Sequence, residues 1–108
     1  MMSDGPIPLA DAIRQKLADS LGPVAYSDLS AHLQRDAVFV VAPSLELVDC
    51  GVAVAMDEVD TVKLWIDTGA LRKPSREERR VWAERGGTFL AVIVQPFVLV
   101  RIDDVNSA

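Results

Sequence analysis

The chain has 108 residues, half of them hydrophobic and a quarter charged, with a formal net charge of −5. This length suits one domain with a single hydrophobic core, and the composition is that of an ordered globular protein, not a disordered one. The acidic balance argues against a protein that binds nucleic acid or anionic lipid mainly through charge.

The cysteine content and the N-terminus both predict a cytoplasmic protein. Cys50 is the only cysteine, so no disulfide can form within the chain. Residues 1–6 carry an acid and a proline where a signal peptide has positive charge followed by an apolar run. The most apolar segment, residues 89–100, is shorter than the roughly 20 residues that cross a bilayer. We therefore expect no membrane partner.

The first half of the chain predicts two helices and a strand. Leucine or isoleucine recurs at every fourth position over residues 9–21, which predicts a helix that Gly22-Pro23 ends. A second, shorter helix is predicted to start with Ser27 as its N-cap. The apolar run over residues 37–42, ended by Pro43, predicts a strand buried on both faces.

The middle of the chain predicts two further helices. Residues 44–56 fit either a strand or a buried helix, and the helical spacing of their apolar residues favours a helix capped by Ser44. Asp57 is expected to cap the next helix, which Gly69 ends. In this helix we expect the apolar residues, among them Val59 and Ile66, to face the core.

The last third predicts a helix and two strands. Ser75 and Glu78 have the spacing of a capping box, in which each side chain accepts a hydrogen bond from a backbone N–H at the start of a helix. Gly86-Gly87 end that helix, and residues 88–94 and 97–102 follow as strands. Because tight hairpin turns favour positive φ, which proline cannot adopt, Gln95-Pro96 predicts either a wider loop or one long strand bent at Pro96.

Together these elements predict an α+β fold in which a small sheet of about three strands packs against four or five short helices. The single domain is expected over residues 8–102. A flexible tail is expected at residues 1–7 and a C-terminal tail at residues 103–108.

Two proline-containing blocks carry a resemblance to a known family. They are Val41-Ala42-Pro43 and Val94-Gln95-Pro96, accompanied by Trp65-Ile66, Lys73-Pro74-Ser75 and Trp82. On these residues the chain resembles the bacterial domain of unknown function family 2288, especially its cyanobacterial versions, over residues 9–101. The resemblance implies a small cytoplasmic bacterial protein with no assigned activity, and it implies no catalytic residues.

Charge is divided unevenly along the second half of the chain. Acids dominate residues 46–67, where Lys63 is the only cation, and we name a possible acidic face formed by Asp57, Glu58 and Asp60. Cations dominate the following segment, and we define the basic patch as Arg72, Lys73, Arg76, Arg79 and Arg80. Such segments are commonly solvated helix faces with charge pairs one turn apart. The functional interpretation is docking between subunits or onto a protein partner.

Other chemistries have weaker support in the sequence. Nucleic acid is disfavoured as a partner because the domain is acidic and no exposed aromatic residues alternate with the basic patch for base stacking. Asp57, Glu58 and Asp60 lack the ligand spacing of a calcium loop, so we expect no metal site. Cys50 and His32 would have to meet to form a catalytic dyad, and the apolar surroundings of Cys50 predict an unreactive thiol. We expect no catalytic residues and no cofactor.

Two functions from different classes follow. The first is a non-catalytic interaction or regulatory module that self-associates or docks a protein partner. The alternative is a small-ligand-binding protein or minor enzyme with an aromatic-lined pocket and one of Arg72, Arg76 or Arg79 as an anion anchor. The pocket would be lined by Trp65, Trp82, Phe89 and Phe97, although aromatic residues at such positions more often belong to the core.

Overall fold

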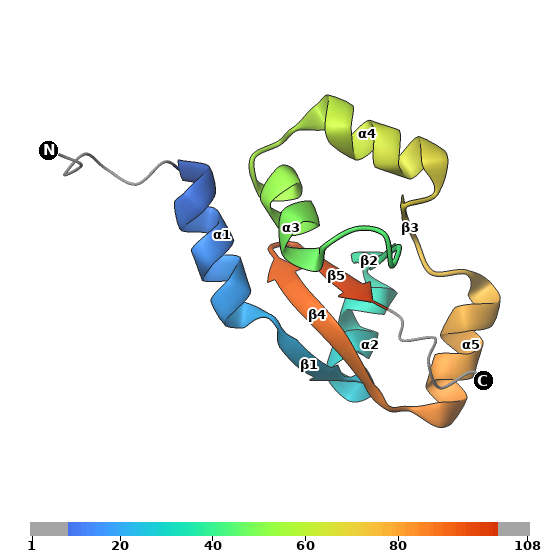
Figure 1. The fold of residues 1–108 in the computed structure, drawn as a ribbon. Coiled ribbons are helices and arrows are strands. Elements are labelled where there is room, and N and C mark those ends of the chain that lie inside the picture. Colours follow the sequence, from blue (N-terminus) through green and yellow to red (C-terminus); the bar gives the residue numbers. More distant parts are fainter. Residues whose placement is uncertain (1–8, 102–108) are drawn as a thin grey trace, which may run out of the picture.

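The structure is a computed structural model that describes residues 9–101, with five helices and five strands in this range (Figure 1). In chain order the elements are α1 (Leu9–Ser20), β1 (Gly22–Ala25), α2 (Tyr26–Gln34), β2 (Val38–Val41), α3 (Leu47–Ala55), α4 (Val59–Thr68), β3 (Leu71–Arg72), α5 (Arg76–Arg85), β4 (Thr88–Val94) and β5 (Phe97–Arg101). The expected tails at residues 1–7 and 103–108 lie outside the described residues.

All five strands form one mixed sheet in the order β1-β4-β5-β2-β3. Only β2 and β5 pair in parallel, with Phe39 opposite Leu99, and the other neighbours are antiparallel. The long antiparallel pair of β4 and β5 and the buried strand β2 therefore form the centre, while β1 and β3 are the two edges.

Side chains alternate between the two faces of the sheet and divide the core into two layers. On β4, Val92 and Val94 pack with residues of α1 and α3, including Leu17 and Cys50. On the opposite face, Phe89 and Ala91 pack with residues of α2 and with Trp82 of α5. In Figure 1, α2 lies behind β4 and α1 stands beside the sheet. We call the layer that packs with α1 and α3 the front core, and the layer that packs with α2 and Trp82 the rear core.

The α+β single domain is confirmed, but the expectation of about three strands is wrong because the sheet has five. The two missed strands are the edges. β1 contains Gly22-Pro23, which signalled the end of a helix, and β3 has only two residues. Both depend on partners distant in sequence, since β1 pairs with β4 and β3 pairs with β2. A pattern of neighbouring residues does not contain that information.

The turn between β4 and β5 also differs from both alternatives. Val94 pairs directly with Phe97, so only Gln95 and Pro96 separate the strands, and the Gln95–Pro96 peptide bond is cis. A cis proline at the third position of a four-residue turn defines the type VI turn. The two strands are thus joined by the two-residue turn that the sequence disfavoured.

Helix boundaries follow local signals where a cap forms. Ser75 accepts from the backbone N–H of Glu78 at 3.0 Å, and Glu78 accepts from the backbone N–H of Ser75 at 2.9 Å, which confirms the capping box. Gly69 ends α4 with φ of 83°, as glycine readily does. The caps expected at Ser27, Ser44 and Asp57 are wrong: the N-cap positions are Ala25, Glu46 and Glu58, without side-chain caps.

Candidate docking groove

Helix α4 is only partly buried against the rest of the molecule. None of its ten residues is fully buried, although Val59, Val62 and Ile66 share one side of the helix at i, i+3 and i+7. Val62 packs against the front core, but Val59 is 60% exposed and Ile66 is 50% exposed. The expectation that Val59 and Ile66 face the core is therefore wrong, and part of the apolar side of α4 has no partner among the described residues.

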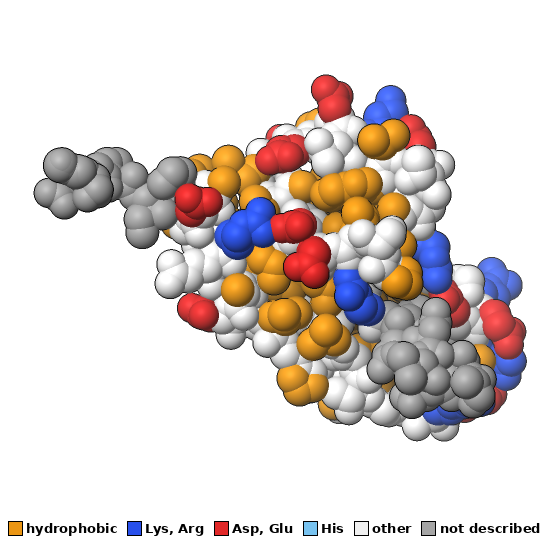
Figure 2. Space-filling model, viewed as in Figure 1, with side chains coloured by type: hydrophobic (Ala, Val, Ile, Leu, Met, Phe, Trp, Pro, Cys, Tyr) orange, Lys and Arg blue, Asp and Glu red, His pale blue; other side chains and the backbone are white. Residues whose placement is uncertain are grey.

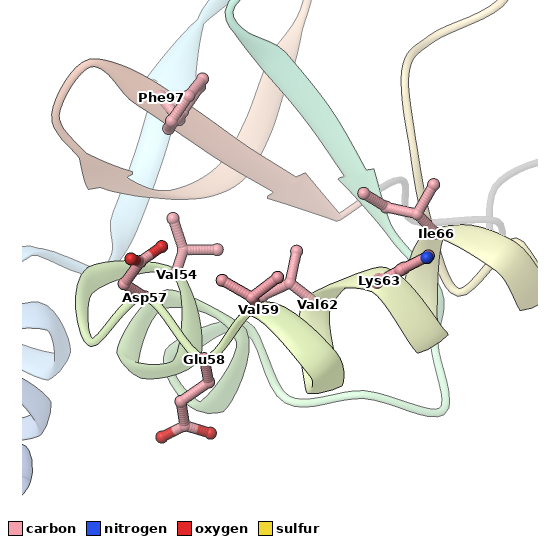
Figure 3. A pocket seen from close by; sticks show the side chains of 8 residues that line it. All are labelled: Val54, Asp57, Glu58, Val59, Val62, Lys63, Ile66 and Phe97. Atoms are coloured by element: carbon pink, nitrogen blue, oxygen red, sulfur yellow. The ribbon is translucent and has the colours of Figure 1, made fainter.

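The uncovered side of α4 borders a cavity of about 430 Å³ (Figure 3). Val59, Val62 and Ile66 of α4 line it with Val54 of α3, and Phe97 of β5 lies across from Val54 and Val59 (Figure 3). A second cavity of about 230 Å³ shares Val54, Val62, Ile66 and Phe97, and continues to Phe39, Leu71 and Leu99 on the sheet. We call these two adjoining cavities the α4 groove. Figure 2 shows hydrophobic side chains at the surface between α3 and α4.

Two phenylalanines form the aromatic part of the α4 groove. The rings of Phe39 and Phe97 meet edge to face with centroids 5.6 Å apart, a favoured arrangement that fixes both rings. Phe97, one of the four aromatic residues expected to line a pocket, does line one. Trp82 and Phe89 instead meet edge to face in the rear core, with centroids 4.9 Å apart, and Trp65 packs against the front core.

The acidic residues at the N-terminal end of α4 do not form one face. In Figure 3 the carboxylate of Asp57 points toward the cavity beside Val54, whereas Glu58 points away from it. Asp57 has φ of 57°, a left-handed conformation that aspartate tolerates better than most residues. Within residues 9–101, none of Asp57, Glu58 and Asp60 forms an ion pair. Lys63 is the cation that lines the groove.

Most of the basic patch is occupied by contacts within the chain. Arg72 donates two hydrogen bonds to the carboxylate of Glu78, at 2.7 and 2.8 Å. Lys73 pairs with Asp36, Arg80 pairs with Glu77 and Glu84, and Arg79 donates to the carbonyl oxygen of Leu33 at 3.0 Å. Arg76 alone among the five has no such contact with the described residues. The patch is assembled by β3, α5 and the segment between them, but its charge is largely neutralised.

These contacts shift the pKa values of two carboxyl groups. The hydrogen bonds from Arg72, with smaller contributions from Ser75, hold the pKa of Glu78 below its ordinary value despite partial burial. The hydrogen bond from Lys73 likewise lowers the pKa of Asp36. In both cases the positive partner stabilises the ionised form, as an ion pair does. The side chains of the patch therefore contribute to structure between β3, α2 and α5.

Cys50 and His32 lie in different layers of the molecule. Cys50 is fully buried in the front core, and burial raises the pKa of its thiol to about 11. His32 belongs to α2 behind the sheet, where its Nδ1 contacts the guanidinium of Arg35 at 3.0 Å. It lines another cavity, of about 520 Å³, beside Gln95 and Pro96, and Phe97 borders this cavity as well as the α4 groove. The sheet therefore separates the two residues that a dyad would require.

Within the described part of the chain, no three metal-binding side chains gather in a way that could hold an ion. No helix among residues 9–101 has the length and apolar character needed to cross a membrane.

The chain is similar to known proteins in both sequence and fold. The chain belongs to the DUF2288 family, described as a protein of unknown function, whose sequence model matches residues 12–102. This confirms the family resemblance. The fold is similar to that in the NMR solution structure of PA1075 from Pseudomonas aeruginosa, with a TM-score of 0.70, 25% sequence identity and 92% of each chain covered. A search of curated proteins found no match.

The residues of the α4 groove were largely missed from sequence. Phe39, Val54, Leu71 and Leu99 each belong to an apolar run that predicts simple burial. The useful signal was in α4, where Val59, Val62, Trp65 and Ile66 make a broad apolar side. The sequence does not show which part of that side stays exposed, because this depends on where α3 and β3 pack in the fold.

Proposed function

We propose that this protein is a non-catalytic interaction module that binds a protein partner through the α4 groove. The observation that carries the proposal is the partial burial of α4, which leaves Val59 and Ile66 exposed beside an apolar cavity. Unpartnered apolar surface next to a cavity is typical of interaction sites, because covering it removes apolar area from water. The α4 groove replaces the basic patch as the docking surface, since that patch is largely paired internally.

A pair of matched variants tests this function. Ile66→Asp places a charge inside the groove, whereas Leu64→Asp places the same charge at a residue of α4 that is 59% exposed and lines neither cavity. Both positions are half exposed or more, so we expect both variants to fold with similar melting temperatures. Each chain is immobilised, and the proteins it captures from a lysate of the source bacterium are quantified by mass spectrometry.

We expect a partner that wild type and Leu64→Asp retain and Ile66→Asp loses. Sedimentation velocity on the same three proteins tests self-association in the same way. Identical captured proteins and identical sedimentation for all three would show that the groove is not an interaction surface.

A small-molecule ligand is the alternative occupant. The larger cavity, at about 430 Å³, falls within the usual range for small-molecule sites, and Phe39 and Phe97 offer aromatic surface. Lys63, not an arginine, is the cation beside these cavities, so an anionic ligand would be held by that lysine. Thermal-shift screening of metabolites decides this alternative, because a ligand that binds only the folded chain raises its melting temperature. A flat response across the library would argue against it.

We also propose that the module acts in the bacterial cytoplasm. The lone cysteine supports this placement, since no disulfide can form within the chain. The resemblance to cyanobacterial members of the family remains a prediction.

A further inference from the structure

We infer that the occupant of the α4 groove is a cationic amphipathic helix of a partner protein. The inference rests on the proposed function and adds the chemistry of the partner. It follows from the length of the groove, from the kind of secondary structure that the groove can accept and from the charges that surround it.

The groove has the dimensions of a helix-binding site. Its wall is α4, whose ten residues extend about 15 Å, so a partner helix of about three turns would lie along it. Val59, Val62 and Ile66 present the i, i+3 and i+7 spacing that pairs with the same spacing on a second helix. An added β-strand fits less well, because the adjoining sheet edge, β3, has only two residues to pair with it.

The charges around the groove favour a cationic partner. Asp57 lines the larger cavity, and Asp60 and Asp67 lie on the adjoining helix α4. All three are exposed and form no ion pair with the described residues, and Lys63 is the opposing charge on this helix. The carboxylate of Asp57 faces the cavity (Figure 3). A purely apolar partner would remove water from that carboxylate without replacing its hydrogen bonds, which is unfavourable. A lysine or arginine beside the apolar residues of the partner would supply a donor at this end.

A second copy of the chain satisfies these requirements less well. Two α4 helices packed together would bring acidic ends from both copies into one interface, and like charges oppose association. The cations that could compensate are largely engaged elsewhere, as in the pairs of Arg72 with Glu78 and Lys73 with Asp36.

The test is selection of peptides from a randomised 16-residue display library on the folded wild-type chain, with counter-selection on Ile66→Asp. Val59→Asp serves as a second groove variant, and Leu64→Asp as the control that must keep binding. We expect the selected peptides to be rich in lysine and arginine, with apolar residues at i, i+3 or i+4, and i+7. Their affinity should fall several-fold between about 50 mM and 500 mM salt, because exposed charges are screened.

Neutralising the rim tests the charge argument directly. Asn suits the left-handed conformation of residue 57, so the double variant Asp57→Asn, Asp60→Asn should keep its fold. It should bind the selected cationic peptides about three- to tenfold more weakly, the effect of losing two exposed ion pairs. Equal binding by wild type and the double variant would overturn the inference.

The remaining outcomes separate the inference from the proposed function. Selected peptides that are neutral or acidic, and that Ile66→Asp loses, would overturn the partner chemistry and leave the groove function intact. A concentration-dependent dimer that Ile66→Asp disrupts and Leu64→Asp retains would identify the occupant as a second copy and overturn the inference. If no peptide distinguishes wild type from both groove variants and no dimer forms, the groove function falls as well.

Discussion

Gly51 lies where α3 comes close to α1 and β4. A Cβ atom at this position would lie 2.8 Å from Cδ1 of Leu17 on α1 and 3.2 Å from Cγ2 of Val94 on β4. Carbon atoms in favourable contact are about 3.5–4.0 Å apart. Glycine in the middle of a helix is normally unfavourable, so its presence in α3 is explained by this packing.

The substitution Gly51→Ala sets two effects against each other. Alanine favours the helix by about 1 kcal/mol relative to glycine. Placing a methyl group in a filled core costs about 1–3 kcal/mol, since Leu17 is only 7% exposed and has to move by several tenths of an ångström or more. We therefore expect Gly51→Ala to lower the free energy of unfolding by about 1 kcal/mol, the difference between these contributions.

A double-mutant cycle separates the effect of the contact with Leu17 from the effect of helix propensity. In a Leu17→Ala background the nearest atom is absent, so Gly51→Ala should be neutral or stabilising there, with a coupling energy of about 1–2 kcal/mol. Urea denaturation of the four proteins gives the required free energies. Leu21→Ala is the control, because Leu21 is not among the atoms near Gly51 and should show no coupling. If Gly51→Ala stabilises the protein by the same amount with and without Leu17, the helices are not in the close contact described.

Two further predictions follow from pKa values. The pKa of Glu78 lies below its ordinary value of 4.5, so the stabilisation from its pairing with Arg72 is present above that pH and is lost as the pH falls through the lowered value. Urea denaturation from pH 5 down to pH 3 should therefore show a weaker pH dependence in Glu78→Gln than in wild type, and parallel curves would contradict the pairing. Burial raises the pKa of Cys50 to about 11, so its thiol should not react with iodoacetamide at pH 8 in the native protein and should react in urea. Labelling is followed by mass spectrometry. Rapid labelling of Cys50 in the native protein would contradict its burial in the front core.

Several elements could be predicted from sequence because their signals are local. The capping box of Ser75 and Glu78, the glycine that ends α4 and the buried strand β2 are each set by residues within a few positions of one another. The family was also recognisable from residues along the chain, and the match to residues 12–102 confirms it. These features need no knowledge of which elements become neighbours.

The candidate site depended on neighbours and was therefore missed. The sequence shows Arg72 in a basic segment, and only folding brings it to Glu78, six positions further along and across the turn into α5. Lys73 meets Asp36 across 37 positions, which removes charge from the patch expected to dock a partner. Ile66 belongs to an apolar helix side that predicts burial, and in the fold it stays half exposed beside the cavities of the α4 groove.

Apolar spacing, glycines and capping residues close together in the chain were enough to predict a single α+β domain, the two C-terminal strands, the C-terminal end of α4 and both ends of α5. Other features appear only in the folded chain. The tertiary structure completed the sheet with β1 and β3, closed the hairpin at Gln95-Pro96 through a cis peptide bond, and left an apolar groove beside α4. The two edge strands and the groove result from pairing or packing between segments far apart in the chain. One apolar side of α4 stays partly exposed because the elements packed against the helix cover only part of that side.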